Sequence, residues 1–364
     1  MRLPIDVMTG KTNSIKTRSG HPTIATIAAH LGLSRATITH VLNGRGTEQR
    51  IRLETQQRVL EVARELGYRP NTSARAVRAG RFGSVALIQS QLGEYLPPEL
   101  LFGLTASMTA RKRQLVMTHV PNVDESGESI VAHTMHELSV DGVFVNRHGF
   151  APAPYLERIR ELRIPAVFLN SKQEFDSVYP DDLMGGELAA AFLLQLGHER
   201  IAYVETEMRR RPHYSETDRR QGYERAMASG QRTPRVHQIP IRWRSADQPT
   251  EDQRVAAAIK LLTGPARPTA IVAYEMDESM AVVRAAIHLG LRIPEDLSLV
   301  HFHNRIDDRC FLPIHTVSNV MREVGEGAVA QLMEKIESPD RPLPSQAIPE
   351  VMLEGATCVP PHRK

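Results

Sequence analysis

Two short segments of helical periodicity, separated by one glycine, constrain the fold of this chain more than any other feature. Apolar residues recur at i, i+3, i+4 and i+7 in residues 24–31, which corresponds to one face of a helix. A second such segment covers residues 34–43 and begins with Ser34, a residue type favoured at a helix N-cap. Gly32 supplies the tight or left-handed backbone step that lets two short helices meet steeply. This layout predicts a helix-turn-helix, whose second helix has the size of the DNA major groove.

The residues that follow favour this interpretation over an unrelated helical hairpin. A third amphipathic segment covers residues 55–66, and an Ala/Arg-rich stretch reaches Gly80. Between Thr23 and Arg81 there are ten arginines and four glutamates, an excess of six positive charges, whereas the whole chain carries only +3. A basic module joined to a non-basic remainder is typical of a protein that binds a polyanion.

Three groups of residues carry a resemblance to a known family: Thr23-Ile24-x-x-Ile27-Ala28, Gly32-Leu33-Ser34-x-x-Thr37-Ile38-x-x-Val41-Leu42-Asn43-Gly44, and Gly67-Tyr68-x-Pro70-Asn71 followed by Ala74-Arg75. In these residues the chain resembles the LacI/GalR family of bacterial repressors. The resemblance is specific up to residue 80 and looser over the remainder. It implies a DNA-binding helix-turn-helix domain at 23–69, a hinge helix or linker at 70–81 and an effector-binding and dimerisation domain at 82–364. Residues 1–22 are expected to be a disordered basic tail or the product of a mis-assigned start.

The predicted recognition helix presents several side chains that suit DNA. Arg35 can pair with guanine O6 and N7, and the methyl group of Ala36 can touch a thymine methyl. His40 stands where the family usually has arginine, so its contacts are expected to be shorter and weaker. Thr37 and Asn43 suit phosphate contacts. The predicted DNA-binding residues are Thr23, Ser34, Arg35, Ala36, Thr37, Thr39, His40, Asn43, Asn71, Ala74, Arg75, Val77 and Arg78.

The hinge carries one departure from the family. Family hinges fold in the minor groove and place a leucine wedge at the central base step. Here the matching residue is Val77, which is shorter, β-branched and a poorer helix former, so a weaker kink is expected. A plain basic linker is the alternative interpretation of residues 71–80.

From Gly83 onwards, short β-rich runs alternate with helical stretches. The expected strands are 84–88, 114–118, 142–145, 166–169, 201–204, 236–239, 269–273 and 297–302, and the helices between them include 98–111, 127–138, 154–162, 184–196, 218–228, 251–262, 278–289 and 320–337. This alternation predicts an α/β fold with parallel sheets. The resemblance implies a two-lobed, periplasmic-binding-protein-like domain. It places lobe N at about 82–196 and 319–337, and lobe C at about 197–318 and 338–364, with crossovers near residues 197, 318 and 338.

Ligands of open α/β sheets bind beyond the carboxyl ends of the strands. Polar side chains gather at those ends here and suit a polar small molecule. By resemblance, Arg219 precedes the Gly-aromatic pair of an effector-binding segment, Asn146 matches a pocket amide, and Trp243 matches a ring-stacking aromatic. The predicted effector-binding residues are Ser90, Asn146, Arg147, Asp181, Arg219, Trp243, Glu275 and His303.

Two departures concern the charge of the effector. His303 replaces the carboxylate that family members commonly offer to sugar hydroxyls, and Glu275-Met276 replaces the Asn-Asp pair that the family usually has after the preceding strand. A histidine can be a cationic donor, so the hypothesis is a sugar acid or another anionic effector bound by Arg219, Arg147 and His303. Glu205 and Glu275 argue against this, and a neutral sugar is the alternative.

Other function classes find less support. The sequence has no nucleophile-base-orienter set, no Gly-rich phosphate loop and no metal spacing, so neither an enzyme nor a cofactor nor a metal is expected. Cys310 and Cys358 lack redox spacing, and no apolar run is long enough for a membrane span, which favours a cytoplasmic protein. We expect a homodimer on a palindromic operator, with lobe closure on the effector altering DNA affinity. The alternative is a two-lobed receptor or sugar-modifying enzyme without sequence-specific DNA binding.

Overall fold

The computed structural model describes residues 22–68, 81–89, 96–119, 139–146, 157, 159–207, 213–240, 251–306 and 312–362. The chain divides into two compact units, Met1–Gly80 and Arg81–Lys364. Residues 1–21 of the predicted tail and residues 70–80 of the hinge predicted at 70–81 lie outside the described residues. No helix in the described ranges is long and apolar enough to cross a membrane.

The described part of the first unit, residues 22–68, is a three-helix headpiece formed by α1 (Ile24–Leu31), α2 (Arg35–Leu42) and α3 (Leu53–Glu65). Gly32 ends α1 with a φ of +65°, the left-handed step that the sequence predicted. One apolar face of each helix closes a common core. The buried members of that core are Ile27, Ala28, Ile38, Val41, Val59, Val62 and Ala63.

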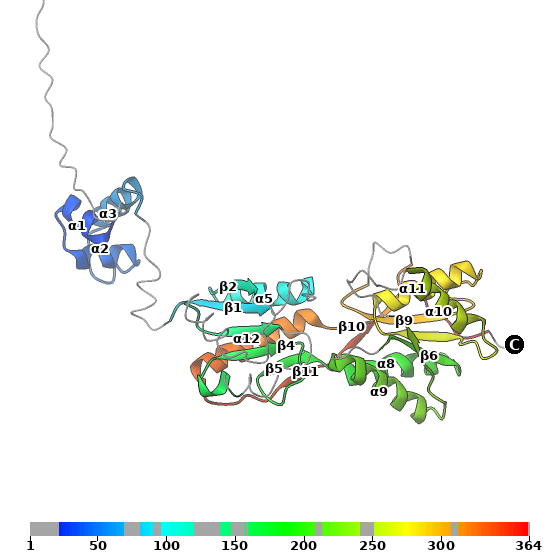
Figure 1. Ribbon diagram of the computed structural model, residues 1–364. Coiled ribbons are helices and arrows are strands. Elements are labelled where there is room, and N and C mark those ends of the chain that lie inside the picture. The colour runs from blue at the N-terminus through cyan, green and yellow to red at the C-terminus, as the bar shows by residue number, and fades with distance from the viewer. Residues whose placement is uncertain are drawn as a thin grey trace, which may run out of the picture. The chain divides into compact units, whose positions relative to one another are not determined.

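The second unit contains two six-stranded sheets, as the sequence predicted for an α/β fold with two lobes (Figure 1). The lobe N sheet has the order β11-β5-β4-β3-β1-β2 and the lobe C sheet the order β12-β10-β9-β8-β6-β7. All pairings are parallel except that of β12 with β10. The strands of lobe N are β1 (Ser84–Gln89), β2 (Gln114–His119), β3 (Val143–Asn146), β4 (Ala166–Leu169), β5 (Ser177–Pro180) and β11 (Gln346–Ile348). Those of lobe C are β6 (Ile201–Thr206), β7 (Val236–Ile239), β8 (Ala270–Ala273), β9 (Ser298–His303), β10 (His315–Ser318) and β12 (Val351–Leu353).

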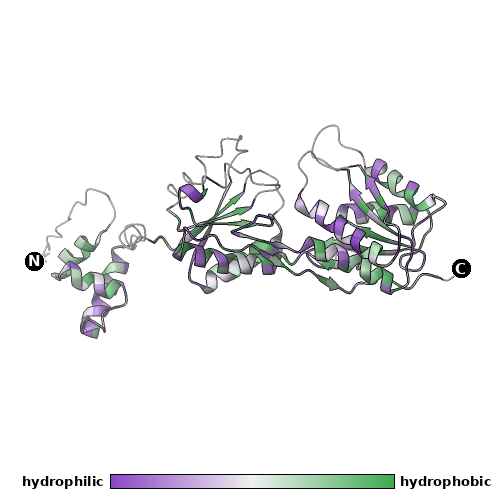
Figure 2. Ribbon diagram, turned by 90° about the horizontal axis from the view of Figure 1, so that it is seen from below, coloured by the Kyte–Doolittle hydropathy of each residue, from purple (hydrophilic) through white to green (hydrophobic). Residues whose placement is uncertain are grey.

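The helices with bounds in the described part of this unit are α5 (Pro98–Ala110), α8 (Asp182–Gln195), α9 (Tyr214–Ser229), α10 (Glu251–Thr263), α11 (Met276–His288) and α12 (Met321–Glu337). The expected helix at 127–138 lies outside the described residues, and that at 154–162 lies partly outside them. In lobe N, α5 and α12 pack on the sheet face that carries Leu87 and Phe144. In lobe C, α8 and α9 cover the face of Tyr203 and Phe302. Figure 2 shows the hydropathy pattern that follows from this packing: the central strands are hydrophobic, whereas the helices alternate between hydrophobic and hydrophilic residues.

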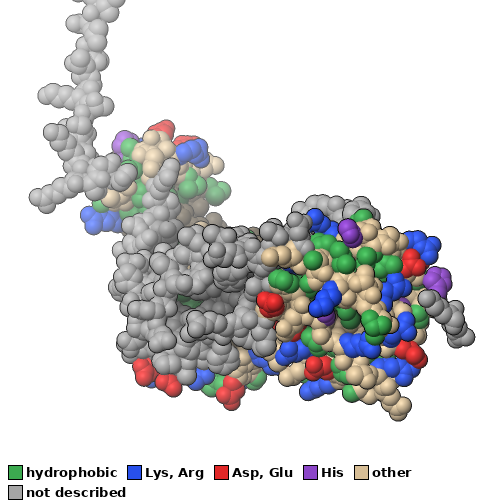
Figure 3. All heavy atoms as spheres, turned by 45° about the vertical axis from the view of Figure 1, so that its right-hand side comes forward, with side chains coloured by type: hydrophobic (Ala, Val, Ile, Leu, Met, Phe, Trp, Pro, Cys, Tyr) green, Lys and Arg blue, Asp and Glu red, His purple; other side chains and the backbone are tan. Residues whose placement is uncertain are grey.

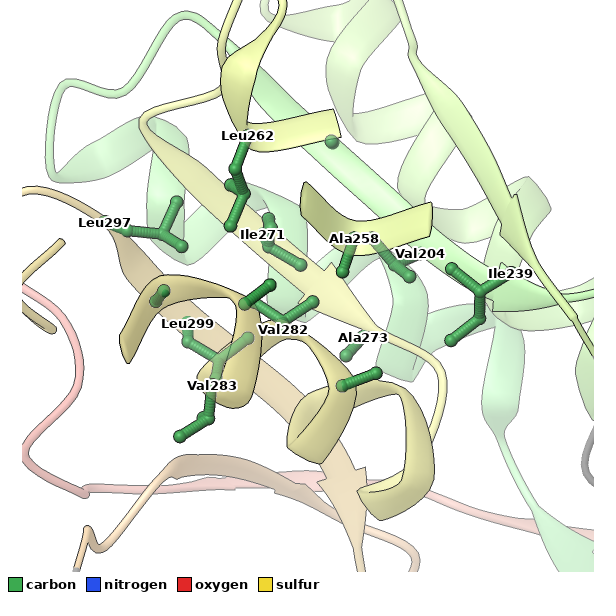
Figure 4. Close-up of a cluster of buried hydrophobic side chains, with 14 of the residues drawn as sticks. Val204, Ile239, Ala258, Leu262, Ile271, Ala273, Val282, Val283, Leu297 and Leu299 are labelled. Atoms are coloured by element: carbon green, nitrogen blue, oxygen red, sulfur yellow. The ribbon is translucent and has the colours of Figure 1, made fainter. Parts of the chain in front are cut away.

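The opposite face of the lobe C sheet is covered by α10 and α11. Figure 4 shows side chains of these helices pointing at strands β6, β8 and β9. Val282 of α11, Ile271 of β8 and Leu299 of β9 are among the labelled residues of this buried cluster. The alternation of strand residues between the two faces, as in Ala202 and Tyr203, is the period of two expected of a sheet buried on both sides.

The lobe boundaries differ from those expected from the sequence. Helix α8 packs against α9 and strands β8, β10 and β12, so it belongs to lobe C, and the first crossover lies near residue 181 rather than 197. Strand β11 pairs with β5 of lobe N, which moves the third crossover from 338 to about 349–350. The second crossover, near 319, lies where it was expected. The physical reason is that long-range contacts, and not local pattern, decide which lobe a segment joins: α8 follows its packing against α9, and the short strand β11 follows its pairing with β5.

Candidate functional site

Hydroxyl groups fix the start of α2, the predicted recognition helix. The Ser34 Oγ accepts a hydrogen bond from the Thr37 backbone N–H at 3.1 Å, and the two hydroxyls lie 2.8 Å apart. At the start of α1, Thr23 and Thr26 form the equivalent reciprocal cap. Thr23, Ser34 and Thr37 therefore have structural roles in the free protein, whatever else they contact.

The exposed side chains of α2 lie at its N-terminal end. Arg35 and Ala36 are exposed, whereas Thr39 and His40 are half-buried. The Thr39 hydroxyl donates to the Arg35 carbonyl oxygen at 2.7 Å. Asn43, at the C-cap, is exposed. The exposed N-terminal end of α2 therefore presents the guanidinium of Arg35 and the methyl group of Ala36. The predicted hinge contacts Asn71, Ala74, Arg75, Val77 and Arg78 lie outside the described residues.

In lobe C the strand order reverses between β6 and β8, since the chain runs from β6 outward to β7 and then back past β6 to β8. Open α/β sheets bind ligands beyond the carboxyl ends of the strands at such a switch point. A cavity of about 10 Å³, room for about one water molecule, lies at this place. Its lining comes from the ends of β6 and β8 and the first turns of α9: Glu205, Thr206, Glu216, Thr217, Arg220 and Tyr274.

An ion pair lines the cavity. Arg220 Nη1 lies 3.1 Å from Glu205 Oε1, which also accepts from Gln238 Nε2 at 3.1 Å. The Glu205 side chain is 7% exposed, while that of Arg220 is 25% exposed and can reach a ligand. Carboxylate, guanidinium and hydroxyl groups in one place offer both hydrogen-bond acceptors and donors.

The neighbouring Arg219, which the motif predicts to bind effector, is 3% exposed and bonded within the protein. Its Nε donates to Asp182 Oδ1 at 2.5 Å, its Nη1 to the Tyr274 carbonyl oxygen at 2.9 Å and its Nη2 to Asn319 Oδ1 at 3.1 Å. Its guanidinium also lies 4.3 Å from the centre of the Phe302 ring. In this arrangement of the lobes Arg219 has little left to offer a ligand.

Close helix packing produces these surroundings. A Cβ on Gly222 of α9 would collide with the Leu183 carbonyl oxygen, and one on Gly186 of α8 would collide with the Arg219 carbonyl oxygen. The two helices can approach this closely because both positions lack a side chain. The approach places Arg219 directly beside the start of α8.

The remaining predicted effector residues lie at several strand ends. Asn146 ends β3 and is 7% exposed. Asp181 accepts from the Met184 N–H at 3.1 Å as the N-cap of α8. Glu275 is the exposed N-cap of α11, and His303 ends β9 half-buried. Ser90, Arg147 and Trp243 lie outside the described residues.

The two lobes touch at the first turn of α9. His213 Nε2 is hydrogen-bonded to the Asn170 carbonyl oxygen at 2.9 Å, and Tyr214 donates to Asn170 Oδ1 at 3.2 Å. Lys172 Nζ lies 2.6 Å from Asp218 Oδ2. Because Glu216 and Thr217 of the same turn line the cavity, movement between the lobes would change the cavity as well.

The sequence did contain a signal for Arg220. In α9 the buried residues Ser215, Arg219, Gly222 and Tyr223 follow helical spacing and define the face that packs inward. Arg220 lies off that face, on a polar stripe with Glu216. The same spacing that buries Arg219 therefore turns Arg220 towards the cavity.

Two family models match the chain. The model described as "Bacterial regulatory proteins, lacI family" matches residues 23–71. The model described as "Periplasmic binding protein-like domain" matches residues 190–358. The first match covers the headpiece, and the second covers lobe C together with α12 and β11.

Curated relatives match over most of their length. The HTH-type transcriptional repressor PurR of Vibrio vulnificus (strain CMCP6) is 25% identical over 327 residues, covering 86% of this chain and 92% of the relative. PurR of Yersinia pestis bv. Antiqua (strain Antiqua) is 26% identical over 324 residues, covering 87% and 91%.

Solved structures share the fold. The Lac repressor dimer bound to operator and the anti-inducer ONPF superposes with a TM-score of 0.74 at 19% identity, covering 93% of this chain and 99% of that one. The CelR–cellobiose complex has a TM-score of 0.59 at 22% identity, covering 93% and 100%. A LacI family regulator from Mycobacterium smegmatis has a TM-score of 0.60 at 25% identity, covering 76% and 100%.

Proposed function

Because the chain belongs to the lacI family of bacterial regulatory proteins, we propose that it represses transcription by binding a palindromic operator as a homodimer in the cytoplasm. It is a DNA-binding regulator and not an enzyme. The observation that carries the DNA-binding role is helix α2 (Arg35–Leu42), whose hydroxyl cap leaves Arg35 and Ala36 exposed at its N-terminal end. The N-terminal residues of a recognition helix are those that contact base edges.

The proposed effector site is built from the lining of the cavity at the switch point of lobe C, which must widen from about 10 Å³ to admit an effector. Arg220 is our candidate for the effector-binding arginine, in place of its buried neighbour Arg219. Glu205 and the Tyr274 and Thr217 hydroxyls supply acceptors and further donors around it. Predicted contacts from Asn146, Asp181, Glu275 and His303, and from Ser90, Arg147 and Trp243, remain part of this proposal.

The chemistry of this lining favours a neutral polar effector over an anion. Two carboxylates, Glu205 and Glu216, line the cavity beside the single cation Arg220. A carboxylate next to an arginine accepts from one hydroxyl of a sugar while the arginine donates to another. The similar regulator CelR was solved with cellobiose, which supports a sugar as the class to test first.

The experiment that tests the DNA-binding role uses a duplex selected from a random pool with the purified protein. Arg35→Ala is expected to weaken binding to the selected duplex by about 5- to 150-fold and to relax specificity at one base pair of each half-site. The matched control is Arg64→Ala, which removes the same charge from an exposed position on α3. Equal losses for the two variants, or no loss with Arg35→Ala, would contradict base readout by α2.

A further inference from the structure

The buried Arg219 is hydrogen-bonded to residues at two of the three crossovers between the lobes and interacts electrostatically with a residue of the third. Asp182 follows the first crossover and Asn319 lies in the second, and both are hydrogen-bonded to Arg219. Glu350 lies in the third crossover, between β11 and β12, and acts electrostatically on Arg219. We name Asp182, Arg219, Asn319 and Glu350 the crossover cluster.

Glu350 is the unsatisfied member of this cluster. Its side chain is 1% exposed, and within the described residues neither carboxyl oxygen has a hydrogen-bond partner. Its Oε2 packs directly on Gly185 of α8. An ionised carboxylate without hydrogen bonds in such a place would be very costly, whereas the neutral acid costs far less.

The charge balance leads to the same conclusion. Two carboxyl groups, those of Asp182 and Glu350, share the single guanidinium of Arg219. Asp182 receives the direct hydrogen bond from Arg219 at 2.5 Å, which stabilises its ionised form although burial raises its pKa. Glu350 receives no such bond. Two charged carboxylates beside one cation in a buried site would repel each other, so one of them keeps its proton.

The groups that face Glu350 come from two elements. Asp182 of α8 and its N-cap Asp181 oppose ionisation of Glu350, while Arg219 of α9 favours it. Tyr214 of α9 is buried in the same surroundings. Burial is the largest influence, and with the two aspartates it raises the pKa of Glu350 well above its ordinary value.

We propose that Glu350 carries a proton in the observed arrangement of the lobes, and that loss of this proton loosens the crossovers. The lobe arrangement then depends on proton activity as well as on the effector. The control of operator affinity by this proton rests on the proposed function, but the protonation itself does not.

The sign of the pH effect follows from linkage. The folded chain holds a proton on Glu350 at pH values where the unfolded chain has released it. Stability that depends on this proton is therefore present in acid and is lost as pH rises from the ordinary value of 4.5 towards the raised pKa. Glu350→Gln imitates the neutral acid and removes this part of the pH dependence.

Infrared spectroscopy of the full-length protein at neutral pH tests the protonation directly. The wild type is expected to show the C=O stretching band of a protonated carboxyl that Glu350→Gln lacks, so that the difference spectrum isolates this group. The control Glu323→Gln changes an exposed carboxyl on α12 and is expected to leave the band unchanged. Identical bands in the wild type and in Glu350→Gln would overturn the proposal.

A second variant tests the cause. Asp182→Asn removes the competing carboxylate, so Glu350 becomes the acidic partner of Arg219 and is expected to ionise, with loss of the same band. A band that persists in Asp182→Asn would refute proton sharing within the cluster. Melting temperatures between pH 5 and pH 8 complete the test, since the wild type should lose more stability across this range than Glu350→Gln.

Operator binding distinguishes this proposal from the proposed function. If the wild type selects no duplex yet shows the Glu350 band, the proposed function fails and the protonated crossover stands. If it binds a duplex with the same affinity from pH 6 to pH 8 and shows no band, the crossover proposal fails alone.

Discussion

At the scale of single residues, two adjacent arginines of α9 have different roles. Arg219 is buried among Asp182, Tyr274 and Asn319, whereas Arg220 is partly exposed beside Glu205. The difference comes from the 100° turn between consecutive helix positions and not from side-chain chemistry. A sequence motif that contains both arginines therefore does not by itself decide which one meets the ligand.

Alanine substitutions should separate the two roles. Arg219→Ala leaves Asp182 buried without its cation, so we expect a loss of about 3–5 kcal/mol in the free energy of unfolding. Arg220→Ala should cost less, about 1–3 kcal/mol, because the guanidinium is partly exposed and the buried Glu205 keeps its hydrogen bond from Gln238, and it should abolish or strongly weaken binding of the effector. Urea unfolding and calorimetric titration with a panel of neutral sugars and sugar acids measure the two effects. Wild-type affinity in Arg220→Ala would remove that residue from the site.

At the scale of elements, the contact of α8 with α9 organises the surroundings of the site. Gly186 and Gly222 remove the side chains that would hold the helices apart, and each glycine lies against a backbone carbonyl of the partner helix. The contact joins the start of α8, which follows the first crossover, to the turn of α9 that lines the cavity. A change in this contact therefore reaches both the crossover cluster and the effector site.

Gly222→Ala should be strongly destabilising for this reason. Its Cβ meets backbone that cannot rotate away, and we expect a cost of about 3 kcal/mol, the upper part of the usual range for overpacking. Gly264→Ala is the matched control, because the nearest atom to its Cβ would be at an ordinary 3.7 Å. The control should change stability by less than about 1 kcal/mol. Equal urea midpoints for the two variants would show that the helices can separate without cost.

At the scale of the whole molecule, buried titratable groups limit stability from both sides of neutral pH. Burial lowers the pKa of His301 to about 3, and neighbouring His303 acts in the same direction. Burial also raises the pKa of Glu278 to about 8, although Arg254 lies 3.4 Å away. The first group disfavours the folded state in acid, and the second disfavours it as pH rises from 4.5 to about 8.

Charges of both signs are interspersed on the face of lobe C in Figure 3, in keeping with a unit that is not a basic module.

We expect His301 to contribute to the loss of stability at low pH. The unfolded chain binds a proton at this residue below its ordinary pKa of 6.5, whereas the folded chain resists it down to about 3. The contribution of His301 to stability should therefore be full above pH 6.5 and fall by up to a few kcal/mol as pH drops towards 3. Urea midpoints measured from pH 7.5 to pH 4 should fall more steeply towards acid, or rise less, in the wild type than in His301→Gln, because the opposing contributions of Glu278 and Glu350 are the same in both proteins. The exposed His288→Gln should retain the full slope; a wild-type slope in His301→Gln would assign the acid limb to other groups.

The sequence by itself determined the helix-turn-helix and the α/β class of the larger unit, because caps, glycine and hydrophobic period are local properties. Ser34, Gly32 and the apolar positions of α1 and α2 lie within one short segment, so their pattern is readable without any partner. The three-dimensional structure alone decided the lobe boundaries, since these depend on the packing of α8 against α9 and on the pairing of β11 with β5. It also decided the roles of Arg219 and Glu350. The charge of a buried group depends on neighbours far away in the chain, and no local pattern records them.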